Sequence, residues 1–324
     1  MAWKVAGEGP EPRASGILGA IGNTPMAKID GVLVKLEHLN PSGSVKDRIA
    51  RYIVSKAENS GELRNGYTIV EATSGNTGIA FSFVAALRGY GMIAVMPHGM
   101  SRERMQIIKG YGAKVMLAGR GGCVKCAVER AEAIARLPQH YMPRQFENPW
   151  NMEEHETVMG PEILRQMSKM NERIDCFVAG VGTGGTLLGC GRAIKKAFPK
   201  AALVAVEPAE CALLSGSGYG EHRIFGLHKN ACAKHRKHMI EGIGDGFIPK
   251  IVSSSRHMID DIITVKSSDA VRETRRLCRM GYFVGPSSGA NMLAARMLQK
   301  RYKNVVTLFP DRGDRYLSEK IFRK

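Results

Sequence analysis

A lysine at position 46 occupies a setting that could make its amine chemically reactive. It follows a Pro-Ser-Gly-Ser turn in the stretch PSGSVKDRIA and falls within the first turn of a predicted helix. Ser44 can cap that turn, and the spacing of Ile49, Ile53 and Ala57 turns one helix face toward a core. Because the positive end of a helix disfavours an ammonium group, we expect the pKa of Lys46 to be lowered. A neutral amine of this kind can act as a nucleophile or as a base.

A polar loop between a strand pattern and a helix pattern occurs in TIVEATSGNTGIAFSF. Residues 73–78 bring hydroxyl groups, an amide and free backbone N–H groups to the predicted start of the helix. Such a helix start is a ready site for a carboxylate or a phosphate. Ordinary N-capping is the alternative interpretation, but one serine or threonine would satisfy it. Four polar side chains between two glycines exceed that requirement.

A glycine-rich loop follows another strand pattern in CFVAGVGTGGTLLGCG. Its backbone N–H groups can form a concave nest around a phosphate. The spacing of Gly180, Gly182 and Gly185 also fits the dinucleotide fingerprint, and Glu207 ends the next strand, where a ribose-binding acid is expected. Taken alone, this loop therefore leaves a nicotinamide cofactor open.

A third loop, GPSSG in GYFVGPSSGANMLAAR, places two hydroxyl groups beside glycines at a helix start. Helix capping by Ser287 or Ser288 would explain this segment equally well. The three loops and Lys46 together supply an amine, a phosphate cradle, a hydroxyl for a ring nitrogen and a carboxylate site. These are the groups that pyridoxal phosphate and an amino-acid substrate require.

The elements that must position these loops are short apolar strands alternating with amphipathic helices. This alternation predicts an α/β fold of parallel-rich sheets with crossover helices on both faces. The pattern breaks near 137–155 and again in 208–250. We predict a smaller, mobile substrate-binding domain at 41–150 and a larger cofactor-binding domain formed by 1–40 and 151–324.

Composition limits the class of protein. The 324 residues carry 47 basic and 30 acidic side chains, a net charge of +17, spread over helix faces rather than interleaved with aromatics. This favours solvated faces over a nucleic-acid surface. No apolar run approaches a membrane span, and the N-terminus lacks the apolar core of a signal peptide, so we expect a cytoplasmic protein. Cys123 and Cys126 form a lone CxxC, which we interpret as two incidental thiols, and we expect no metal site.

Six motifs resemble the β-replacement family of fold-type II pyridoxal-phosphate enzymes. They are PSGSVKDR, EATSGNTG, GVGTGGT, EGIGDGFIP, GPSSGAN and PDRGDRYLS, in family order. The family includes O-acetylserine sulfhydrylase (cysteine synthase) and cystathionine β-synthase. The resemblance implies a tryptophan synthase β-like fold of two three-layer αβα domains, pyridoxal 5'-phosphate as cofactor, and a homodimer. It also argues against a dehydrogenase, which has no use for the SVKDR lysine.

The resemblance implies roles for individual residues. Lys46 would form the Schiff base with the cofactor and then act as the general base. The cofactor would also be bound by Asn76 at its ring hydroxyl, by Ser287 at its pyridine nitrogen, and at its phosphate by Gly182, Thr183, Gly184, Gly185 and Thr186. The substrate carboxylate would be bound by Thr73, Ser74, Asn76 and Gln145, with Gly242 bordering the substrate amine and the leaving group.

The implied reaction is β-replacement on O-acetylserine or O-phosphoserine through an α-aminoacrylate, with sulfide added to make L-cysteine. A cystathionine β-synthase or a cysteine desulfhydrase-type lyase could use the same site, so the nucleophile stays open. The SVKDR, TSGNTG and GTGGT motifs differ from those of serine or threonine dehydratases of this fold. A basic regulatory or nucleic-acid-binding protein on the same scaffold is the alternative of another class.

One segment departs from the sulfhydrylase pattern. Residues 221–240 are longer than that pattern and rich in Lys, Arg and His. They could form an anion-accepting lip for O-phosphoserine, but an exposed loop in a basic protein is the interpretation we favour. Cys232, His235 and His238 match no strong metal-ligand spacing. Arg312 stands where the family more often has a small polar residue, and the sequence suggests no role for it.

Overall fold

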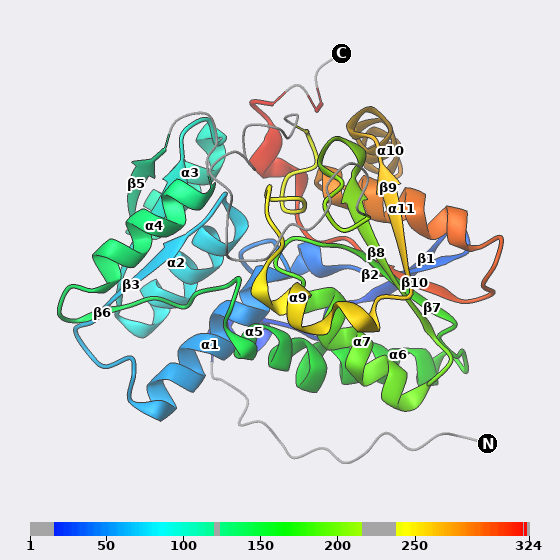
Figure 1. Cartoon of the computed structure of the whole chain (residues 1–324), viewed down its shortest axis with the longest axis horizontal. Helices are drawn as coiled ribbons and strands as arrows, with labels where there is room; N and C mark the ends of the chain where they lie inside the picture. The colour runs from blue at the N-terminus through cyan, green and yellow to red at the C-terminus, as the bar shows by residue number, and fades with distance from the viewer. Residues whose placement is uncertain (1–15, 120–123, 216–237, 320, 323–324) are drawn as a thin grey trace.

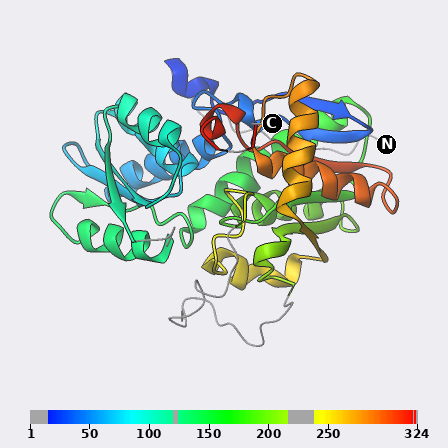
Figure 2. The same cartoon turned by 90° about the horizontal axis from the view of Figure 1, so that it is seen from above.

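Two separate β-sheets, each covered by helices, organise the chain (Figure 1). The computed structural model describes residues 16–119, 124–215, 238–319 and 321–322. In Figure 2, seen from above, the two helix-covered sheets lie beside one another. The predicted α/β class with parallel-rich sheets is confirmed.

The larger sheet has six strands in the order β1-β2-β10-β7-β8-β9. Its strands are β1 (Met26–Ile29), β2 (Val32–Lys35), β7 (Cys176–Gly180), β8 (Ala202–Pro208), β9 (Asp261–Val265) and β10 (Val305–Leu308). Only the β1–β2 pair is antiparallel within the described sheet; the other neighbours are parallel. Both faces are apolar, as expected for parallel strands buried on two sides.

Strand alternation divides the core around this sheet into two layers. Phe177 and Ala179 pack on one face with α6 (Gly160–Lys169) and α7 (Gly185–Ala197). Their neighbour Val178 packs on the opposite face. That face is covered by α10 (Ser267–Arg279) and α11 (Pro286–Leu298).

The smaller sheet has four parallel strands in the order β5-β4-β3-β6. They are β3 (Thr68–Ala72), β4 (Gly91–Pro97), β5 (Lys114–Ala118) and β6 (His140–Tyr141). One face packs on helices α1 (Lys46–Ser60), α2 (Asn76–Arg88) and α3 (Arg102–Gly110). The other face packs on α4 (Val124–Ala135).

The connection between the sheets is helical where the sequence pattern predicts only a break. Asn148 caps α5 (Pro149–Glu154) through a side-chain bond from the Trp150 N–H at 2.9 Å. A π-helical turn (His155–Met159) continues it into α6. The break predicted for 137–155 is therefore wrong over its second half, where Pro149 follows a capping asparagine. The remaining short elements are α9 (Lys250–Ser255) and 3₁₀ turns at Gly16–Ala20, Glu37–Leu39, Ala209–Cys211, Arg256–Met258 and Gly313–Tyr316.

Two expectations about the chain's surroundings and thiols bear on this fold. Among the helices that the structure describes, none has the length and apolarity needed to cross a bilayer. Cys126 is disulfide-bonded, so the prediction of an unpaired thiol at this position is wrong. The described residues contain no cluster of three potential metal ligands, and Cys232 and His235 lie outside them.

Candidate active site

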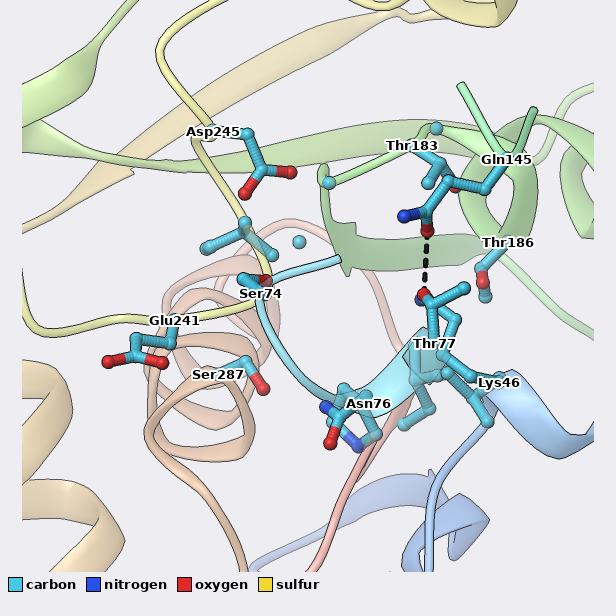
Figure 3. Close-up of a pocket in the computed structure, with 18 of the residues that line it drawn as sticks. Lys46, Ser74, Asn76, Thr77, Gln145, Thr183, Thr186, Glu241, Asp245 and Ser287 are labelled. Carbon is cyan, nitrogen blue, oxygen red and sulfur yellow. Dashed lines mark hydrogen bonds between the residues drawn. The ribbon is translucent and has the colours of Figure 1, made fainter. Parts of the chain in front are cut away.

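A pocket lies where the loops after the parallel strands of both sheets meet helix starts, as expected for α/β folds. It is lined by Lys46 from α1, Ser74 from the loop before α2, Thr183 from the loop before α7, and Ser287 from the start of α11 (Figure 3). The three loops predicted from the sequence therefore converge on one cavity together with the lysine.

Lys46 is the first residue of α1, and its backbone N–H donates to the Ser44 hydroxyl at 3.3 Å. Ser44 thus supports the first turn, although Val45 holds the N-cap position and makes no side-chain bond there. The pKa of Lys46 is lowered mainly by burial, against the opposing charges of Asp245 and Asp311. The predicted direction is confirmed, but burial is the cause the structure identifies. The arrangement favours a neutral amine.

A buried ion network fixes the helix that carries Lys46. Arg48 donates to both oxygens of Glu37 at 2.7 Å and to Glu162 at 2.9 Å, and Lys35 also binds Glu162. Burial alone would raise the pKa of Glu37, but the Arg48 guanidinium lowers it to about 2. The network joins α1 to the 3₁₀ turn Glu37–Leu39, β2 and α6, so it positions the helix that carries the lysine.

The loop before α2 is held together by Thr73. Its hydroxyl accepts the N–H groups of Gly75 and Gly78 at 2.9 and 3.0 Å, and the side chain is buried. Ser74 lines the pocket, whereas Thr73 is absent from the described lining. The predicted contact of Thr73 with a substrate carboxylate therefore stays a prediction, and the observed contacts of Thr73 shape the loop.

Thr77 and Gln145 form a polar pair beside this loop (Figure 3). The Thr77 hydroxyl donates to Gln145 Oε1 at 2.6 Å, and Gln145 Nε2 donates to the Ala72 carbonyl at 2.8 Å. Both residues line the pocket, and Gln145 is buried. Thr77 was not predicted as a site residue, although it belongs to the TSGNTG motif.

Asn76 lies at the start of α2 with both ends of its amide engaged. Its Nδ2 donates to Asp311 Oδ2 at 2.6 Å, and its Oδ1 accepts from Arg315 at 2.5 Å. The contacts predicted for Asn76 with a cofactor and a substrate would therefore compete with these bonds. The same bonds tie α2 to the C-terminal segment 311–316.

The glycine-rich loop forms a cradle at the N-terminus of α7. Gly184 has φ +86°, and a Cβ at Gly182 or Gly185 would lie 2.3 Å from the Gly242 carbonyl oxygen or 2.0 Å from Asn151 Oδ1. Only glycine fits such close approaches. The open backbone at a helix N-terminus suits a phosphate group.

Two hydroxyl groups complete this cradle. The Thr183 hydroxyl accepts from Asn151 Nδ2 at 3.1 Å and from the Gly185 N–H at 3.3 Å. The Thr186 hydroxyl lies 3.1 Å from His155 Nε2. These contacts hold the cradle's shape from the side of α5 and the π-helical turn.

Glu207 separates the two interpretations of the glycine-rich loop. Its carboxylate is buried and accepts the backbone N–H groups of Leu214 and Ser215 at 2.8 and 2.9 Å. Because both oxygens bind the following loop, they are not presented to a ribose. Glu207 therefore does not serve as the ribose-binding acid that the dinucleotide interpretation requires.

Ser287 and Ser288 differ in orientation at the start of α11. Both are buried, but only Ser287 belongs to the described pocket lining. The Ser288 hydroxyl is buried, and none of the residues that the structure describes forms a hydrogen bond with it. The structure therefore presents the first serine of GPSSG to the cavity, as the predicted role requires, although that role stays a prediction.

The loop from Glu241 to Asp245 supplies two charged residues that were not predicted from the sequence. Both acids line the pocket (Figure 3), and Gly242, which lies between them in the chain, lines it as well. Arg104 of α3 also lines it and forms an ion pair with Glu241. Both acids belong to the EGIGDGFIP motif, so the motif marked this loop as part of the site. Only the folded structure shows that their side chains line the pocket.

The fold, the amine of Lys46 in the pocket and the phosphate cradle define a pyridoxal-phosphate-dependent enzyme. Lys46 can supply the imine nitrogen, and residues 182–186 fit the cofactor's phosphate. The chain belongs to the family described as pyridoxal-phosphate dependent enzymes, which matches residues 17–311. The predicted family and cofactor are confirmed.

Similar proteins narrow this class. The chain is 41% identical over 314 residues to a cysteine synthase of Staphylococcus aureus, covering 93% of this chain and 95% of that protein. It resembles the structure of a cysteine synthase from Entamoeba histolytica at 32% identity, with a TM-score of 0.83 and coverage of 99% and 95%. An O-acetylserine dependent cystathionine β-synthase from Helicobacter pylori matches at 34% identity, with a TM-score of 0.84 and coverage of 95% and 98%.

The sequence departs from the family pattern at Arg312 and in the segment 221–240, and the structure describes the first fully and the second only in part. Arg312 is half-exposed and pairs with Asp314 at 2.5 Å, while its backbone N–H donates to the Gly43 carbonyl at 3.1 Å. It therefore takes part in local contacts near the turn before α1. The basic segment 221–240 lies outside the described residues up to position 237.

Proposed function

We propose that this chain is a cysteine synthase that replaces the Cβ substituent of an O-activated L-serine by sulfide. The observation that carries the proposal is a half-buried Lys46 in one pocket with a phosphate cradle, Ser287 and the loop 73–78. The similarity to cysteine synthases over nearly the whole chain supports the same reaction. When bound, pyridoxal phosphate supplies an electron sink for negative charge at the substrate Cα.

The residues of this chain would divide the work by position. We assign the substrate carboxylate to Ser74, Thr77 and Gln145, at the positive end of α2. Residues 182–186 would bind the cofactor's phosphate, and Ser287 its ring nitrogen. A serine hydroxyl does not enforce a positive ring nitrogen as a carboxylate would, which favours elimination over prolonged carbanion chemistry.

Lys46 would move the proton. Its neutral amine, favoured by burial, takes the Cα proton of the substrate as the Cβ–O bond breaks and acetate or phosphate leaves. Sulfide then forms the Cβ–S bond, and the protonated lysine returns a proton to Cα. The products are L-cysteine and the released acid, so atoms and charge balance.

The assembly and its motion follow as proposals. We propose a cytoplasmic homodimer in which residues 41–150 close on the larger unit of 1–40 and 151–324. The four-stranded sheet lies wholly within that smaller range, and Arg104 reaches Glu241 across the pocket. Solution scattering that finds a monomer, or no compaction with substrate, would contradict this proposal.

A steady-state assay tests the function. The purified holoenzyme is given O-acetylserine and sulfide, and L-cysteine is quantified by chromatography. We expect turnover by the wild type and a loss of at least ~10³-fold in the Lys46→Ala variant, since a positioned base alone contributes 10²–10⁴-fold. Lys56→Ala, on the exposed part of the same helix, is the matched control. Cysteine formation by Lys46→Ala at wild-type rate, or consumption of homocysteine in preference to sulfide, would refute the proposal.

A further inference from the structure

Four charged side chains belong to the described pocket lining, and two of them neutralise each other. Arg104 and Glu241 form an ion pair, and the Arg104 guanidinium also lies over the Tyr316 ring, with its Cζ 4.5 Å from the ring centre. The Arg104 side chain is only 2% exposed. Its charge is therefore already satisfied before any substrate arrives.

Asp245 has no such partner. Within the part of the chain that the structure describes, its carboxylate makes no hydrogen bond or ion pair, and it projects into the pocket (Figure 3). His238 lies near it, but His238 Nδ1 accepts the Ile240 N–H at 3.2 Å while Nε2 lies 2.9 Å from the Gly244 carbonyl. Both ring nitrogens of His238 therefore have backbone partners, and among the described residues the imidazole makes no hydrogen bond or ion pair with the Asp245 carboxylate.

The remaining basic side chain is Lys46, which interacts electrostatically with Asp245. In the proposed function this amine is neutral when the donor binds, because it must then take the Cα proton. No other cation in the described lining can then compensate negative charge brought in on the substrate's Cβ substituent. Gly242, predicted to border the leaving group, lies between the two acids in the chain.

We infer that Asp245 is a specificity-determining residue that admits serine donors with an uncharged Cβ substituent, such as an acetyl ester, and excludes phosphorylated donors. The inference rests on the proposed function and names its donor class. A phosphate monoester carries nearly two negative charges at neutral pH. In a partly desolvated pocket, a neighbouring carboxylate repels it strongly.

Protonation of Asp245 would not remove this discrimination. Burial already raises the pKa of Asp245, against the charges of His238 and Lys46. A phosphate in the pocket must either face the charged carboxylate or drive it to take up a proton. Both outcomes weaken binding of the phosphorylated donor, whereas an acetyl ester meets neither cost.

The kinetic test compares kcat/KM for O-phosphoserine and O-acetylserine at one sulfide concentration, ionic strength and pH. We expect the wild type to prefer O-acetylserine, and Asp245→Asn to raise the phosphoserine-to-acetylserine ratio at least ~10-fold. Asp245→Glu keeps the charge and should keep the wild-type preference. A ratio within twofold of wild type in Asp245→Asn, or a wild type that prefers O-phosphoserine, overturns the inference.

A binding test separates this inference from the proposed function. The holoenzyme's cofactor absorbance is titrated with L-2-amino-3-phosphonopropionate, which has no Cβ–O bond to break, and with uncharged L-methionine. Asp245→Asn should bind the phosphonate at least ~10-fold more tightly than wild type and methionine within threefold. If neither donor is turned over but this selectivity is found, the proposed function fails and the inference stands. Equal phosphonate affinity in both proteins refutes it; Asp245→Ser replaces any variant that does not bind the cofactor.

Discussion

The charges that hold the helix of Lys46 and the charge of Asp245 in the pocket differ in whether they have partners. In the helix network, Arg48 is bonded to Glu37 and Glu162, and the pKa of Glu37 is lowered to about 2. In the pocket, Asp245 has no partner among the described residues, and burial raises its pKa. Both sets are close to Lys46, because Arg48 lies on the same helix and Asp245 lines the same pocket.

The difference separates charges that hold the fold from charges kept for a ligand. A buried ion whose partners are all present is stable in place, although its net contribution to stability is modest. An unpaired buried carboxylate costs free energy that the fold must offset elsewhere, and such groups concentrate at functional sites. On this comparison Arg48 positions the helix of Lys46, while Asp245 acts on what enters the pocket.

The largest expected effect comes from breaking the paired set. Arg48→Ala leaves Glu37 buried without its bonded cation and Glu162 with Lys35 alone, so we expect the free energy of unfolding to fall by ~3–5 kcal/mol. Urea unfolding of the cofactor-free protein measures this. The exposed Lys56–Glu153 pair is the control, since Lys56→Ala should cost less than ~1 kcal/mol. If Arg48→Ala and Lys56→Ala lowered the free energy of unfolding equally, the Arg48 network would not hold the fold as proposed.

A smaller effect is expected at Glu71, a buried acid of β3 that accepts the backbone N–H groups of Ala72 at 3.0 Å and Gln145 at 3.3 Å. Burial raises its pKa to about 8. A raised folded-state pKa means that stability is fully present below the unfolded value near 4.5 and is lost as the pH rises through about 8.

We therefore expect the wild type to lose ~2–4 kcal/mol between pH 5 and pH 9 through this group, since one pKa unit corresponds to ~1.4 kcal/mol. Glu71→Gln should remove most of that slope, because the amide stays neutral. Urea unfolding at both pH values measures the slope. If the pH dependence of stability were unchanged in Glu71→Gln, Glu71 would not be the group that causes it.

The smallest expected effect is on stability at Asp245. Asp245→Asn removes an unpaired charge from a partly desolvated pocket, so the cofactor-free protein should become more stable by ~1 kcal/mol at neutral pH. Thermal and urea unfolding measure the change, and Asp245→Glu, which keeps the charge, should give no gain. Destabilisation by Asp245→Asn would mean that its carboxylate has a structural partner, and the comparison would fail at this residue.

Much of the site could be predicted because its loops have local signatures. Ser74, Asn76, residues 182–184, Thr186, Gly242 and Ser287 all line the pocket that contains Lys46. Each stands in a turn that joins a strand, or an extended segment, to a helix or to another turn, and polar or glycine residues mark such turns in sequence. Thr77, Arg104, Glu241 and Asp245 were missed because nothing in their local spacing distinguishes them from capping or surface residues.

The sequence by itself determined the alternation of strands and helices, the three loops and the place of Lys46 at a helix start, because periodicity, capping and turn chemistry act over a few residues. Only the tertiary structure decided which charges are paired. Arg48 meets Glu162 across 114 positions, Asn76 meets Asp311 across 235, and Arg104 meets Glu241 across 137. Desolvation and the distance between charges set their energies, and both exist only once the chain has folded.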